Sequence, residues 1–97
     1  MEQSLIQSIQ EYFKSQPIEK AWLFGSFSRG EQTTDSDVDL LVRFDKDAHV
    51  GLFAHTRMVL ALEQLLNRKV DLVPEGALLD FAKDSVDRDK QLIYTKL

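Results

Sequence analysis

The sequence contains no cysteine, so neither a disulfide nor a thiolate zinc site can form. No apolar run approaches the roughly 18 residues that a membrane-spanning helix needs, and the N-terminus lacks the basic and apolar regions of a signal peptide. Basic residues are also few: 12 Lys and Arg stand against 16 Asp and Glu, for a net charge of −4. Binding of DNA or RNA through a broad basic face is therefore not expected. We predict a soluble, cytoplasmic protein that contacts neither a membrane nor nucleic acid.

The remaining composition is typical of one small globular domain. The 97 residues are 43% hydrophobic and 29% charged, which are ordinary values for a folded soluble chain. A chain of this length can bury a modest core and has no residues to spare for a second domain. We therefore predict a single domain over residues 1–97.

Apolar spacing predicts helices that alternate with strands. Apolar residues recur at helical spacing in some segments and form short bounded runs in others. Ser4 and Gln7 fit a capping box at the first helix, and the tail is ambiguous, with a last helix that runs into a short edge strand as one interpretation. This order predicts a small α/β sheet with helices packed on it. The predicted helices are 4–15, a short one that starts within 26–30, 52–67 and 75–83. The predicted strands are 18–24, 37–44 and 70–73, and the tail is 85–97.

The most informative stretch joins a Gly-Ser turn to a pair of acidic residues. Gly25 and Ser26 follow the first predicted strand, and Asp37 and Asp39 come after ten intervening residues. Glycine at such a turn lets a phosphate approach the backbone, and serine at a helix N-terminus adds a hydroxyl donor. Carboxylates at i and i+2 of a strand point to one face and can share divalent cations. A phosphate-binding turn beside Mg²⁺ ligands is suited to nucleotidyl transfer.

Each of these features also has a purely structural interpretation. Ser26 can cap a short helix, and Asp37 and Asp39 can form the polar face of an edge strand. We favour the metal site because aspartate suits strands poorly and two like charges on one face repel each other. Arg29, one turn after Ser26, is as consistent with a solvated position as with a triphosphate contact. Asp35 is more consistent with a loop turn than with a metal ligand.

The same stretch resembles the signature of the DNA polymerase β-like nucleotidyltransferase superfamily. That signature is a Gly-Gly or Gly-Ser turn followed by Asp-x-Asp or Asp-x-Glu between apolar residues. The longer string, Gly-Ser-x-x-Arg-Gly from residue 25 and Ser-Asp-x-Asp-Leu from residue 36, is similar to the minimal nucleotidyltransferases (MNT), often found beside a helical HEPN partner. The resemblance implies the nucleotidyltransferase fold, a small mixed β-sheet with helices packed on it.

The resemblance also implies roles for individual residues. The family expects a third carboxylate on a later strand, and Asp71 supplies one. The catalytic residues would be Asp37, Asp39 and Asp71, which would together hold two Mg²⁺ ions, with Asp71 as a metal ligand or as the base for the nucleophile. Ser36 would support the loop before the acidic pair. The set that binds the nucleotide phosphates or supports that loop would be Gly25, Ser26, Arg29 and Ser36.

The context of Asp71 leaves one alternative open. Asp71 interrupts an aliphatic run, and a carboxylate among buried aliphatic side chains is costly unless it is paired or ligated. Besides a catalytic role, a salt bridge with Lys69 or Arg43 would satisfy it.

Aromatic residues and histidines elsewhere are expected to have structural roles. Trp22 and Phe24 in the first predicted strand fit the core better than a base-stacking surface, and Phe27 is the one aromatic residue that we assign to a nucleobase contact. His49 and His55 do not have the spacing of a helical metal pair. We expect surface or capping roles for them.

The resemblance implies an enzyme that transfers AMP from ATP to a hydroxyl of a partner protein. The expected role is that of an antitoxin that modifies a tyrosine of a HEPN-type RNase toxin. One small domain leaves no evident acceptor pocket, so a partner protein or a second copy of the chain would supply that surface, in a hetero- or homo-oligomer. Two alternatives stay open: a binding-only antitoxin that sequesters its toxin, and a small-molecule nucleotidyltransferase of the antibiotic-modifying type.

Overall fold

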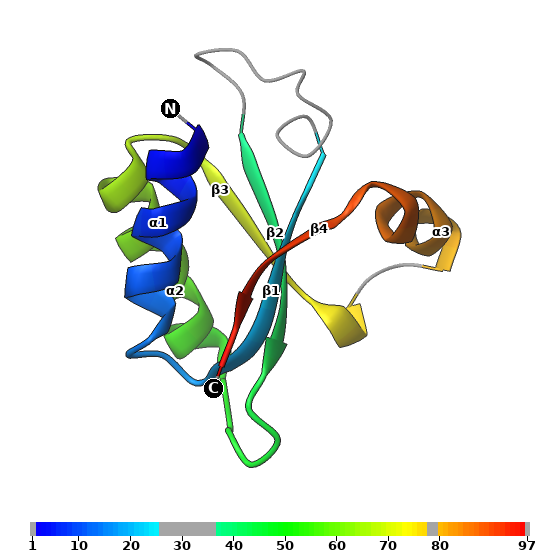
Figure 1. Cartoon of the computed structure of the whole chain (residues 1–97). Helices are drawn as coiled ribbons and strands as arrows, with labels where there is room; N and C mark the ends of the chain where they lie inside the picture. The colour runs from blue at the N-terminus through cyan, green and yellow to red at the C-terminus, as the bar shows by residue number, and fades with distance from the viewer. Residues whose placement is uncertain (1, 26–36, 78–79, 97) are drawn as a thin grey trace.

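The computed structural model describes residues 2–25, 37–77 and 80–96, which form a four-stranded mixed sheet with helices on both sides (Figure 1). The strand order is β3-β2-β1-β4; β2 is parallel to β3, and the other neighbours are antiparallel. The sheet therefore confirms the predicted mixed α/β architecture. In chain order the elements are α1 (Glu2–Phe13), β1 (Ile18–Phe24), β2 (Val38–Phe44), α2 (Leu52–Leu66), β3 (Val70–Pro74), the 3₁₀ helix η1 (Glu75–Ala77), α3 (Asp80–Asp89) and β4 (Gln91–Thr95).

One face of the sheet packs against α1 and α2, which lie side by side on it (Figure 1). Side chains alternate between the two faces of a strand, and Val38, Leu40 and Val42 of β2 are fully buried on this face. Burial of such side chains stabilises the fold by about 1.5–3 kcal/mol each. This core fixes which residues of β2 face the other way. Its members from the helices include Ile9, Phe13, Met58 and Leu62.

The opposite face carries a smaller apolar cluster. Trp22, Leu41 and Val86 are buried together, and Phe24 and Val73 pack against them. Val86 comes from α3, which lies on this side of the sheet (Figure 1). The prediction that Trp22 and Phe24 belong to the core is confirmed.

Several predicted boundaries move. The capping box is wrong, because α1 already begins at Glu2 and places Ser4 inside the helix. The predicted helix over 75–83 corresponds to the 3₁₀ helix η1 and the start of α3, and Gly76 disfavours a regular α-helix at its beginning. The ambiguous tail is the end of α3 followed by the edge strand β4.

The position of β2 also corrects a premise about the acidic pair. The strand begins at Val38, one residue later than predicted, and lies between β1 and β3 rather than at an edge.

None of the helices described here has the length and apolar character needed to cross a membrane.

Candidate active site

Asp39 and Asp71 lie next to each other on the sheet face opposite α1 and α2. They are paired in the parallel register of β2 and β3, so their side chains point to the same face. Asp39 is half-buried and Asp71 is exposed. Neighbouring strands are about 4.8 Å apart, so one divalent cation can contact both carboxylates. Register pairing thus brings together two acids that are far apart in the sequence.

Gly25 lies directly against the Asp39 carboxylate. Phe24, the last residue of β1, is the register partner of Asp39, and Gly25 follows with a φ of +74°. A Cβ added at Gly25 would overlap Oδ2 of Asp39 and lie 3.2 Å from its Cγ. Glycine is therefore needed here for two reasons: the left-handed backbone and the close approach of a carboxylate.

Asp37 stands just ahead of β2 and is exposed to solvent. The next residue is held in the sheet, because the Val38 N–H donates to the carbonyl of Lys69 over 2.9 Å. The sequence places Asp37 two residues before Asp39, as the metal-site hypothesis requires, but β2 itself does not include it.

The described acids do not enclose a metal ion by themselves. Within residues 2–25, 37–77 and 80–96, no group of three or more Asp, Glu or His side chains has the arrangement of a metal site. Mg²⁺ usually binds one or two carboxylates and completes its shell with water and substrate phosphates. The pair Asp39 and Asp71 fits that mode of binding, in which the nucleotide brings the remaining ligands.

The rest of the predicted phosphate-binding set lies outside the described residues. This applies to Ser26, Arg29 and Ser36 and to the short helix predicted after Gly25. Asp35 and Phe27 fall in the same segment. Their roles stay predictions.

The burial argument for Asp71 is wrong, although its placement is as expected. Asp71 is exposed, because its face of β3 is not covered by the α1 and α2 core. The salt bridge suggested with Arg43 is not formed, since Arg43 bonds Glu75 through Nε at 2.8 Å and Nη2 at 3.0 Å. Arg43 also contacts Glu19 at 3.4 Å.

Further along this face, two cations lie over Trp22. The Arg43 guanidinium is 5.5 Å and the Lys90 ammonium 4.9 Å from the ring centroid. Such contacts stabilise by about 0.5–1 kcal/mol at exposed sites. They link β1 and β2 to the C-terminal end of α3. Sequence reasoning missed them because no local pattern connects these residues.

The Arg43–Glu75 pair makes stability depend on acid pH. Hydrogen bonding to Arg43 lowers the pKa of Glu75 below its ordinary value of 4.5, with help from the charges of Arg43 and Lys90 and against burial and Asp87. A depressed folded-state pKa gives stability that is present above pH 4.5 and is lost as pH falls through the lower value. We expect Glu75→Gln to flatten the fall of the urea midpoint below pH 4.5.

A matched control for this prediction is Glu11→Gln. Glu11 pairs with Lys14 at 2.9 Å, but both side chains are more than 60% exposed, at 73% and 64%, so the pair is screened by solvent. The urea midpoint of this variant should still fall below pH 4.5, as it does in the wild type. Equal flattening by both substitutions would contradict the assignment to Glu75.

Comparison with known proteins identifies the family. The family described as Nucleotidyltransferase domain matches residues 3–93. A protein of Methanocaldococcus jannaschii that is named for an inferred protein adenylyltransferase activity is 38% identical over 73 residues, 74% of this chain and 71% of that protein. The protein adenylyltransferase MntA of Thermococcus cleftensis is 39% identical over 61 residues, 63% of this chain and 60% of that protein. The chain belongs to the nucleotidyltransferase domain family, so the predicted enzyme class is confirmed.

Solved structures agree on the fold. An inferred minimal nucleotidyltransferase is 35% identical, with a TM-score of 0.63 over 91% of this chain and 85% of that chain. A chain in the complex of a tri-AMPylated Shewanella oneidensis HEPN toxin with its MNT antitoxin has a TM-score of 0.74 at 19% identity, over 99% of this chain and 74% of that chain. At that identity the second likeness shows the fold alone.

Proposed function

We propose that the protein transfers AMP from ATP to a hydroxyl of a partner protein in a Mg²⁺-dependent reaction. The observation that carries the proposal is the in-register pair Asp39 and Asp71, with Gly25 packed against the first carboxylate. A glycine turn, a carboxylate and a second carboxylate from the next strand meet at one end of one sheet face. This arrangement suits a triphosphate whose charge is neutralised by metal.

The residues divide the chemistry between binding and proton transfer. Asp37 and Asp39, with Asp71 beside them, would hold Mg²⁺, which supplies charge stabilisation at the phosphates and lowers the pKa of a hydroxyl. Gly25, Ser26 and Arg29 would hold the phosphates, and Ser36 would support the loop before the acidic pair. The acceptor oxygen attacks the α-phosphorus, the bond to the β-phosphate oxygen breaks, and pyrophosphate leaves. Asp71, which is exposed, would accept the hydroxyl proton.

We infer that the acceptor belongs to a helical HEPN-type toxin and that the protein acts as its antitoxin, as a single domain over 1–97. The proposal draws on the relatives named protein adenylyltransferase and on the Shewanella complex, in which the toxin carries AMP. The excess of acidic over basic residues, 16 against 12, suits a protein acceptor better than a nucleic acid.

Intact mass spectrometry tests this function. The protein is incubated with Mg²⁺, ATP and the protein encoded beside it, and a variant with both Asp37→Ala and Asp39→Ala serves as control. We expect whole AMP units to be added by the wild type and not by the variant. A stable complex without any mass change would instead support a binding-only antitoxin. If neither a complex nor a mass change is observed, the small-molecule nucleotidyltransferase becomes the better explanation.

A further inference from the structure

β3, which carries Asp71, has its outer backbone groups bonded by side chains of α2. β3 is an edge strand in the described sheet, and an edge presents N–H and C=O groups without strand partners. The Val38 N–H donates a hydrogen bond to the Lys69 carbonyl, which therefore points toward β2. Because backbone groups alternate in direction along a strand, the N–H and C=O groups of Val70 and Leu72 point away from β2.

Two side chains of α2 bond these outward groups. Oε2 of Glu63 accepts a hydrogen bond from the Val70 N–H at 3.1 Å. Nε2 of His55 lies 2.7 Å from the carbonyl oxygen of Leu72, and since a carbonyl only accepts, Nε2 is the donor. Both side chains are half-buried. The two bonds reach β3 one residue before and one residue after Asp71.

The helix that supplies these bonds is itself firmly held. Met58 and Leu62, which lie between His55 and Glu63 in the sequence, are 3% and 0% exposed and belong to the main core. The two polar side chains therefore extend from a packed helix and not from a mobile loop.

We propose that His55 and Glu63 are positioning residues that hold Asp71 in register with Asp39 for metal binding. The proposal rests on the proposed function, because it assigns the pair to the same site. β3 has only five residues, and a slip of one residue would turn Asp71 to the opposite face. Bonds at both flanks oppose such a slip, as outer partners of metal ligands commonly fix ligand geometry.

The test measures metal binding without turnover. Mn²⁺ is titrated with α,β-methylene-ATP, whose α–β bond is not cleaved, in the presence and in the absence of protein. Free Mn²⁺ is followed by electron paramagnetic resonance, and the decrease beyond that caused by the nucleotide alone measures binding to the protein. We expect His55→Ala and Glu63→Ala each to weaken Mn²⁺ binding by about tenfold. His55→Gln and Glu63→Gln keep a donor and an acceptor, respectively, and should restore most of the affinity. His49→Ala, at an exposed histidine, should bind like the wild type.

A second readout follows the strand directly. Hydrogen exchange at the Val70 amide should accelerate in Glu63→Ala and return toward the wild-type rate in Glu63→Gln. Faster exchange with unchanged Mn²⁺ affinity would overturn the positioning role and leave the bonds a matter of stability. If the wild type does not bind Mn²⁺, both the proposed function and this inference are overturned. If the wild type binds Mn²⁺ and the variants bind it equally well, only this inference fails.

Discussion

Asp39→Asn is expected to lower AMP transfer by at least about a thousandfold, equivalent to about 4 kcal/mol in the barrier. Asparagine keeps the shape of the side chain but removes the charge that a metal ion needs beside the triphosphate. Asp39 holds the central position of the candidate site, because it lies in register with Asp71 and against Gly25. Single-turnover rates at saturating ATP measure the effect on the chemical step.

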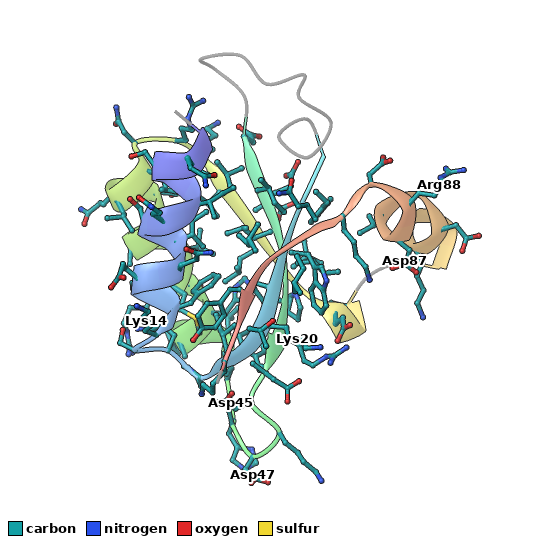
Figure 2. The ribbon with its side chains drawn as sticks, viewed as in Figure 1. Lys14, Lys20, Asp45, Asp47, Asp87 and Arg88 are labelled. Carbon is teal, nitrogen blue, oxygen red and sulfur yellow. The ribbon has the colours of Figure 1, made fainter. Side chains whose placement is uncertain are left out.

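The matched control is Asp47→Asn. Asp47 follows the C-terminal end of β2, whereas Asp39 lies near its N-terminal end. Asp47 is exposed, and Figure 2 labels it in the loop after β2. Its neutralisation should change the rate less than twofold, as expected for a surface change remote from the site. Far-UV circular dichroism should show both variants folded. A folded Asp39→Asn variant with nearly wild-type transfer would remove Asp39 from the metal site.

The placement of the acids could be predicted because it depends on local pattern. Alternation in β2 and the interruption of β3 by Asp71 are both visible in the sequence, and both acids lie on the face opposite the main core. The argument that Asp71 is costly to bury failed because its two nearest neighbours, Val70 and Leu72, pack into the main core on the face opposite to Asp71. Apolar neighbours in a strand say little about burial of the residue between them.

Contacts between distant segments could not be predicted from the sequence. Arg43 contacts Glu75 and Trp22, and the His55 side chain bonds the Leu72 carbonyl. These contacts form only because folding brings distant segments of the chain together. The expectation that His55 has a surface or capping role is thus corrected: it is half-buried and bonds a strand edge. Histidine spacing along the chain carries no information about such a partner.

Gly25→Ala is expected to impair both folding and transfer. An L residue with a φ of +74° costs about 1–2 kcal/mol of stability, and the new Cβ must displace the Asp39 carboxylate. A shift of about 1 Å in a catalytic group can lower the rate by about a hundredfold. We therefore expect the rate of AMP transfer at saturating ATP to fall by about a hundredfold. Urea unfolding measures the stability change.

Two further variants separate backbone strain from the displaced carboxylate. Gly76→Ala adds a Cβ with no heavy atom within 4 Å, so unfolding should change by less than about 0.5 kcal/mol. In an Asp39→Ala background the overlapping oxygen is gone, and Gly25→Ala should then cost only the strain of its φ. A double-mutant cycle measures this coupling. Additive stability changes would show that the Gly25 backbone and the Asp39 carboxylate are independent, and the requirement for glycine would then come from the turn alone.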